Sequence, residues 1–249
     1  MDEQLPEALE AVRAAHFDAG GKACDYAALA ASPERARLAE RLAGLEGYNL
    51  ARERVPAQMA FWINVFNAGV LRDAQELAGA KSLRQVQAFF ERPRLRIGPH
   101  DYSLDEIEHG LLRGNVAKPG RSRPPMQRGD PRLESMPIVF DERIHFALYS
   151  ACRSSPPLRI YGYGWLDRQL EEATAAYVHQ GIRVEKQGAL IVVPRLFQWF
   201  AQDFGGESGI VEFVVARIED EAVVEMVDKR LGRVKLHYTE FDWSLNRRE

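Results

Sequence analysis

Residues 57–80 constrain the fold more than any other part of the sequence. The segment AQMAFWINVFNAGVLRDAQELAGA has the pattern of a helix, and its first half is apolar on nearly every side. A helix of that kind is buried among other elements. Asn64 and Asn67 interrupt the apolar surface three residues apart and therefore share one face. We expect a central helix whose two amides need partners, because an unpaired buried amide costs about 1–3 kcal/mol.

Composition narrows the class of protein. The 249 residues, 46% of them hydrophobic, suffice for one or two domains with a sizeable core. Lys and Arg number 33 against 36 Asp and Glu, and this balance argues against a dedicated nucleic-acid-binding protein. Two distant cysteines, Cys24 and Cys152, exclude a disulfide-stapled scaffold and a cysteine-rich zinc site. The six histidines show no metal-ligand spacing, so we expect neither a metal nor a cofactor.

Targeting signals are also absent from the sequence. The N-terminal residues lack the basic start and apolar run of a signal peptide. No stretch approaches about 18 apolar residues, so we expect no membrane span. We therefore expect a cytoplasmic protein whose cysteines are reduced thiols.

The rest of the chain alternates between helical and extended patterns. Helices are expected over 5–15, 33–47, 103–114, 167–180, 195–204 and 209–218, and extended segments over 94–102, 144–152, 183–193 and 234–242. The hairpin within 183–193 is expected to turn near Gln187 and Gly188. These patterns predict an α+β fold. We expect a single domain over 45–246, a small, mostly antiparallel sheet packed by helices, preceded by an N-terminal helical extension over 1–44.

Two local signals refine this picture. Ser103 and Glu106 have the spacing of a capping box, in which each residue caps the other's backbone at a helix start. Residues 115–137, which are rich in Pro, Gly and Arg, predict a long exposed loop.

Polar residues at three places are candidates for a catalytic site. The first is the asparagine pair, the second is Glu108 with His109, and the third is the run HFALYSACRSS at 145–155. If residues 144–152 are a strand, alternation places His145 on the face opposite Ser150 and Cys152. A base for either nucleophile must then come from elsewhere. His109 is the candidate, because the pKa of histidine lies near neutral pH.

Each candidate also has a structural interpretation. The asparagines can bind loop backbone, and the Glu–His pair can lie on a salt-bridged helix face. Cys152 can be a small buried apolar residue. Ser154 and Ser155 can shape a turn before the prolines that follow. Asp203 is a further candidate at the end of an aromatic helix, where a carboxylate needs a cationic partner.

Five sequence blocks resemble one known family. They are AFWINVFNA at 60–68, SLDEIEHGLLRG at 103–114, RIHFALYSACRSSPPLRIY at 143–161, LFQWFAQDFGG at 196–206 and FDWSLN at 241–246. Their order resembles that of the domain of unknown function 547. The resemblance implies that family motif positions lie here at Trp62, Asn64, Asn67, Glu108, His109, His145 and Asp203. A fainter likeness to papain-like and transglutaminase-like cysteine enzymes implies nucleophilic catalysis.

The chain departs from this family at one informative place. The family segment commonly reads NCGAKSCPPL, whereas serine stands here at both cysteine positions, Ser150 and Ser155. The nearby thiol, Cys152, is displaced by two residues. The chain would therefore use Cys152, use a serine, or lack such an activity.

The first predicted function is a thiol- or serine-type hydrolase or acyltransferase acting on an amide, peptide or ester. Cys152 or Ser150 would attack the carbonyl of a small-molecule or peptide substrate, and His109 would take the proton. The groups expected to orient the imidazole are Glu108, Asn64 and Asp203. The groups expected to bind substrate are Asn67, His145, Arg153, Ser154 and Ser155, and backbone N–H groups near the last two would stabilise the oxyanion.

The second predicted function is a non-catalytic binding or scaffold module, a degenerate enzyme-like domain. Its docking surface would be the loop 115–137. From Arg113 to Arg132 the chain carries six basic residues and one acidic residue, Asp130. Such a loop attracts a phosphate, an acidic or phosphorylated protein segment or an anionic membrane. Nucleic acid ranks third as a partner, because no aromatic residues interleave with the basic ones to stack bases.

Overall fold

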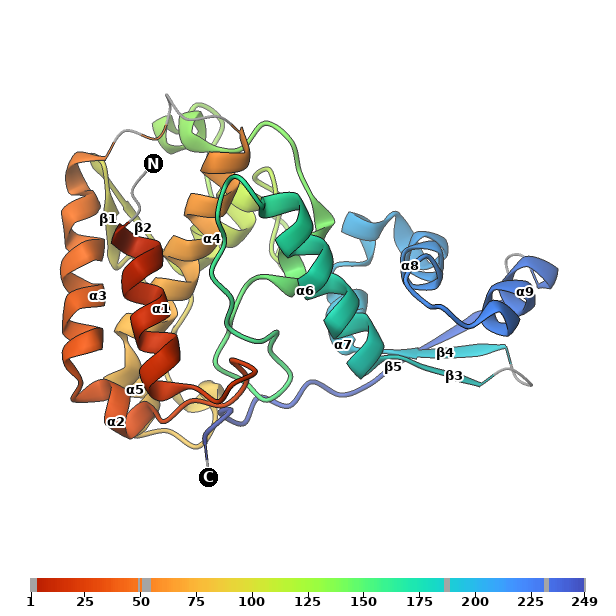
Figure 1. Ribbon diagram of the computed structural model, residues 1–249. Helices are drawn as coiled ribbons and strands as arrows, with labels where there is room; N and C mark the ends of the chain where they lie inside the picture. The colour runs from red at the N-terminus through yellow and green to blue at the C-terminus, as the bar shows by residue number, and fades with distance from the viewer. Residues whose placement is uncertain (1–3, 49, 51–54, 186–188, 231–232, 249) are drawn as a thin grey trace. The chain divides into compact units, whose positions relative to one another are not determined.

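A computed structural model describes residues 4–48, 50, 55–185, 189–230 and 233–248 (Figure 1). The chain forms two compact units. The first comprises residues 1–169 and 243–249, and the second comprises residues 170–242. The C-terminal residues therefore belong to the unit in which the chain begins.

Helix α4 (Val55–Arg72) forms the core of the first unit, and all of its residues from Ala57 to Leu71 are buried. Helices α1 (Gln4–His16) and α3 (Pro33–Ala43) pack against it (Figure 1). Ser32 begins α3 by accepting a hydrogen bond from the backbone N–H of Arg35 at 3.1 Å. The central buried helix predicted from the sequence is confirmed.

The helix predicted over 57–80 is interrupted at Asp73 and resumes as α5 (Ala74–Ala78). The carboxylate of Asp73 accepts hydrogen bonds from Arg72, at 3.0 Å, and from Arg94. A carboxylate held by two guanidinium groups explains why the chain leaves the helix there. The short helix α2 (Tyr26–Ala30), which contacts α5, was not predicted.

A hairpin and a widened helix follow. Strands β1 (Leu95–Ile97) and β2 (His100–Tyr102) pair antiparallel, as predicted. The next helix, η4 (Glu106–Leu112), is a π-helix, which is wound more widely than an α-helix and is often found at functional sites. The capping box before it is confirmed: the N–H of Ser103 donates to Glu106 at 2.8 Å, and the N–H of Glu106 donates to Ser103 at 3.1 Å.

The strand predicted over 144–152 is wrong. The segment begins with a 3₁₀-helix, η6 (Glu142–Phe146), which Asp141 caps by accepting from the N–H of Arg143. Irregular backbone follows, and Ala151 has a positive φ of 58°. Backbone groups in this part bind the amide of Asn67 instead of a neighbouring strand. The expected division of side chains between two strand faces therefore does not apply.

The second unit holds most of the strand content. Helix α6 (Leu166–Gly181) leads into β3 (Arg183–Glu185) and β4 (Leu190–Val193), which pair antiparallel. Strand β5 (Lys235–Tyr238) pairs parallel with β4. In the sequence, four helices separate β4 from β5: α7 (Arg195–Trp199), η7 (Ala201–Phe204), α8 (Gly206–Val215) and α9 (Glu221–Lys229). The predicted turn at Gln187 and Gly188 lies outside the described residues.

The α+β class with small sheets and packed helices is confirmed. The other short helices are η1 (Gly44–Gly47), η3 (Leu83–Gln85) and η5 (Pro131–Ser135). Helix α9 was not predicted, and the domain boundary proposed at residue 45 stays a prediction. No helix in the described part of the chain has the length and apolar character that crossing a membrane requires.

Candidate functional site

The two asparagines of α4 bind backbone. Asn64 donates to the carbonyl of Tyr161 at 2.7 Å and accepts from the N–H of Tyr161 at 3.0 Å. Asn67 donates to the carbonyl of Ala147 at 3.1 Å and accepts from the N–H of Tyr149 at 2.8 Å. In each amide, the NH2 group donates and the oxygen accepts. The two amides hold two loop segments against the central helix, as in the structural interpretation of the pair.

His109 is buried on η4, with 3% of its surface exposed. Its Nδ1 lies 3.1 Å from Nη1 of Arg113, which is buried as well. A guanidinium can only donate, so Nδ1 accepts and the proton of the neutral imidazole lies on Nε2. Two carboxylates complete the surroundings: Asp105 lies 3.9 Å from Nε2 and Glu108 lies 3.9 Å from Nδ1. The nitrogen that would accept a proton is therefore engaged by Arg113.

Asp105 and Arg113 were missed by the sequence reasoning, although a signal existed. Each is four residues from His109, so the three side chains share one face of the helix. Burial raises the pKa of the Asp105 carboxyl above its ordinary value, although an ion pair of 2.7 Å with Lys118 opposes this. The result is a polar cluster, Asp105–Glu108–His109–Arg113, in which His109 and Arg113 are buried and the two carboxylates are partly buried. The loop that follows closes it on one side.

The predicted nucleophiles are held in a turn. Cys152 is 1% exposed, and its thiol donates a hydrogen bond to the carbonyl of Trp243, with 3.7 Å between Sγ and the oxygen. The hydroxyl of Ser155 accepts from the N–H of Ser150 at 2.8 Å and donates to the carbonyl of Pro156 at 2.9 Å. These contacts match the structural interpretations of a buried cysteine and a turn-forming serine.

The remaining predicted residues lie in the turn that follows Cys152, on η6 and on η7. Arg153 is exposed and Ser154 is partly buried. His145 is buried on η6, its ring 6.5 Å from that of Phe140. Asp203 belongs to η7 in the second unit, whereas the other ten predicted site residues belong to the first. Among the described residues, no group of three or more His, Cys, Asp or Glu side chains is arranged to hold a metal ion.

A second buried polar cluster was not predicted. The hydroxyls of Tyr26 and Tyr149 lie within hydrogen-bond distance of each other and of Oδ1 of Asn246, and the two hydroxyl protons are shared among these three contacts. Burial raises the pKa of both tyrosines well above the ordinary value. The backbone of Asn246 continues the contact, accepting from the N–H of Cys24 at 2.9 Å and donating to the carbonyl of Ala151 at 3.2 Å. The C-terminal segment thus runs between residue 24 and the turn that holds Cys152.

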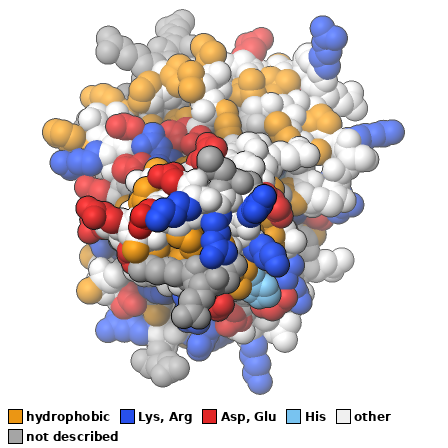
Figure 2. Space-filling model, turned by 90° about the vertical axis from the view of Figure 1, so that its right-hand side faces the viewer, with side chains coloured by type: hydrophobic (Ala, Val, Ile, Leu, Met, Phe, Trp, Pro, Cys, Tyr) orange, Lys and Arg blue, Asp and Glu red, His pale blue; other side chains and the backbone are white. Residues whose placement is uncertain are grey.

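The basic loop 115–137 is largely exposed, as predicted, but much of its charge is neutralised. Lys118 pairs with Asp105 at 2.7 Å, and Arg121 pairs with Glu91 at 3.4 Å. Arg132 binds Glu106 and Asp130, and Arg113 is buried. On a different face, the one at the right-hand side of Figure 1, acidic and basic side chains are likewise interspersed (Figure 2).

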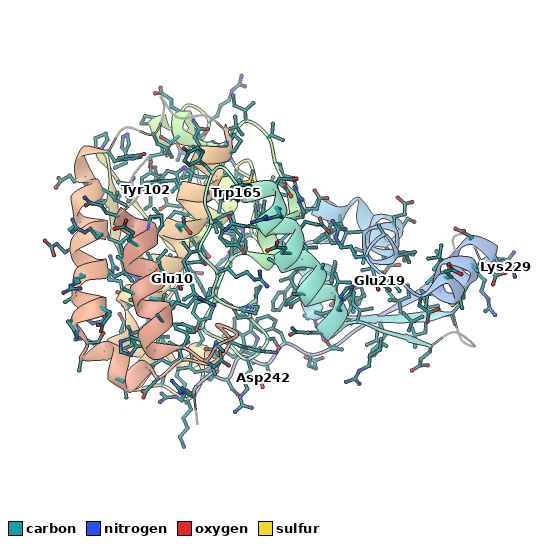
Figure 3. All side chains as sticks on the ribbon, in the orientation of Figure 1. Glu10, Tyr102, Trp165, Glu219, Lys229 and Asp242 are labelled. Atoms are coloured by element: carbon teal, nitrogen blue, oxygen red, sulfur yellow. The ribbon has the colours of Figure 1, made fainter. Side chains whose placement is uncertain are left out.

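Large apolar side chains are exposed just after this loop. Ile138 is 85% exposed and Trp165, labelled in Figure 3, is 64% exposed. Arg143 links their two segments, because its guanidinium binds Asp141 and Asp167, each at 2.7 Å. The exposed apolar residues of these two segments are Ile138, Val139, Phe140, Tyr163 and Trp165, and we refer to them together as the apolar patch.

A pocket of about 340 Å³ lies elsewhere on the first unit, beside Glu76, Gln85 and Arg92. None of the eleven predicted site residues lines it.

A comparison with protein families matches residues 51–178 to the family described as "Protein of unknown function, DUF547". The chain belongs to this family. The predicted resemblance is thereby confirmed for more than half of the chain. The matched part of this DUF547 protein includes the His109 cluster and the apolar patch, but neither Asp203 nor Asn246. Comparisons with curated proteins and with solved structures found no match.

Proposed function

We propose that this DUF547 protein is a binding module that docks a protein partner through the apolar patch. The observation that carries the proposal is the exposure of Ile138 and Trp165, at 85% and 64%. Large apolar side chains gathered at the surface are typical of interaction sites. Trp and Tyr are also the residue types that contribute most binding energy at interfaces.

The two segments of the patch are linked through the guanidinium of Arg143. Asp141 and Arg143 form the start of η6, and Asp167 lies in the first turn of α6. Because one guanidinium binds both carboxylates, the segments 138–140 and 163–165 are tied to a common point. A surface that is ordered before binding loses less conformational entropy when the partner docks.

Docking through the basic loop, the alternative drawn from the sequence, has less support. Of the loop's basic residues, Lys118, Arg121 and Arg132 are paired within the domain, and Arg123 and Arg128 are exposed. An acidic partner would have to compete with these pairs.

Acyl transfer remains a second candidate, favoured by the two carboxylates 3.9 Å from the ring nitrogens of His109. It requires rearrangement, because Arg113 engages Nδ1 and the thiol of Cys152 is buried. Thiol-directed and serine-directed probes test it: labelling of the folded chain that His109→Ala abolishes would favour catalysis.

A random-peptide display selection against the full chain tests the binding proposal. Selected peptides should bind Ile138→Asp and Trp165→Ala at least about tenfold more weakly, a loss of about 1.4 kcal/mol. Val224→Asp is the matched control, because Val224 is an exposed apolar residue on α9, outside the patch. The control should leave the Kd unchanged. Peptides whose binding is indifferent to both patch variants would overturn the proposal.

A further inference from the structure

We infer that the partner segment presents apolar anchors flanked by lysine or arginine. This inference rests on the proposed function, because it identifies what the apolar patch selects.

Carboxylates outnumber basic groups in the two segments that carry the patch. Residues 134–143 and 163–168 contain four acidic residues and two arginines. The acidic residues are Glu134, Asp141, Glu142 and Asp167, and the basic ones are Arg143 and Arg168. The border of the patch is therefore acidic, in a chain whose overall charge is close to balanced.

Both arginines are occupied. Arg143 is shared between Asp141 and Asp167. The guanidinium carbon of Arg168 lies 4.9 Å from the centre of the Trp165 ring, a cation–π arrangement. Arg143 is thus paired within the domain, whereas Arg168 keeps its charge while it lies against the Trp165 ring.

The acidic side chains, in contrast, have charge to offer. Within the part of the chain that the structure describes, Glu134 and Glu142 make no ion pair. Glu134 is exposed and Glu142 is partly exposed. Asp167 keeps a side chain that is 91% exposed although it contacts Arg143. These carboxylates lie two to four residues along the chain from members of the patch, so a partner with apolar anchors and basic flanks would complement both features.

The same charges disfavour other occupants. An anionic membrane would be repelled by the acidic border. A second copy docked patch to patch would bring one acidic border against another, because a two-fold interface pairs identical surfaces. Like charges brought together at an interface are costly.

The peptides obtained with the full chain test this inference separately from the proposed function. Patch-dependent peptides should be enriched in Lys and Arg beside their apolar residues. A Lys-flanked peptide should bind the double variant Glu134→Lys/Glu142→Lys about tenfold more weakly at low salt, and the difference should shrink as salt is raised. Glu40→Lys is the matched control, an exposed carboxylate on α3, and it should bind like the unsubstituted chain.

Four results would overturn the inference. Patch-dependent peptides with acidic or uncharged flanks would refute it and leave the proposed function standing. An unchanged Kd in the charge-reversed variant would do the same. Peptides that ignore Ile138 and Trp165 would overturn the proposed function and the inference together. Co-sedimentation with phosphatidylserine vesicles that depends on Ile138 would instead identify a membrane as the occupant and refute the inference.

Discussion

Asn64 and Asn67 bind backbone groups that lie 80 to 97 residues away in the sequence. Each amide offers a donor and an acceptor, so a single side chain on a helix can replace the pairing that a neighbouring strand would provide. The loops at 147–149 and 159–161 depend on these two residues for their position. Single polar residues therefore determine the path of the chain around α4.

Replacing Asn67 with Ala should lower the free energy of unfolding by about 2–4 kcal/mol. The substitution removes a buried hydrogen-bond partner from the carbonyl of Ala147 and from the N–H of Tyr149. Denaturation in urea, followed by tryptophan fluorescence, measures the change. Gln87→Ala is the control, since that amide is exposed and its loss should cost under about 0.5 kcal/mol. A loss below 1 kcal/mol for Asn67→Ala, by the same scale, would contradict the assigned role.

At the scale of elements, the C-terminal segment covers the turn that holds Cys152. Leu245 forms a β-bridge with Cys152, and Arg247 forms one with Cys24. The carbonyl of Trp243 accepts from the Cys152 thiol and from the hydroxyl of Ser82, the latter at 2.9 Å. Both thiols are therefore shielded by residues at the end of the chain.

Loosening this segment should expose Cys152. In a Cys24→Ser background, where one thiol remains, Asn246→Ala should speed modification by a thiol reagent about tenfold, equivalent to 1.4 kcal/mol in local opening. The reason is that Asn246 anchors the segment to Tyr26 and Tyr149. Arg248→Ala, an exposed neighbour, should leave the rate unchanged. Equal rates in the Asn246 variant and its parent would show that another element shields the thiol.

Elements whose signals are local could be predicted from the sequence. The buried helix, the capping box at Ser103 and the hairpin at 95–102 each depend on residues a few positions apart. The segment 144–155 was misread, because its conformation depends on Asn67 and on the C-terminal segment, both distant in sequence. An apolar run alone suited a strand equally well.

The candidate site, too, could be predicted only where its signals are local in the sequence. Residue identities such as Asn64 and His109 could be selected as unusual, but their partners could not be chosen from type alone. Arg113 could have been identified as a partner of His109, because it lies four residues further along the helix. The contact between Tyr26 and Asn246 could not, because it joins opposite ends of the chain. The apolar patch could not be anticipated, because sequence patterns predict burial for residues such as Ile138.

At the scale of the whole molecule, the family match covers residues 51–178, and the chain forms two compact units. The family region carries both a buried polar cluster around His109 and an exposed apolar surface. Buried ionisable side chains that bind one another stabilise or position groups inside the domain. Exposed tryptophan and isoleucine side chains are instead available for contact with another molecule. This contrast is the basis of our proposal that the chain recognises a partner through the apolar patch.

The most direct test is differential hydrogen–deuterium exchange of the full chain with and without a display-selected, Lys-flanked peptide. The account predicts slower amide exchange in residues 138–143 and 163–168, which carry the apolar patch and its acidic border. The Ile138→Asp variant should lose this protection. Protection confined to residues 115–128 of the basic loop, or to the segment around His109, would contradict docking at the apolar patch.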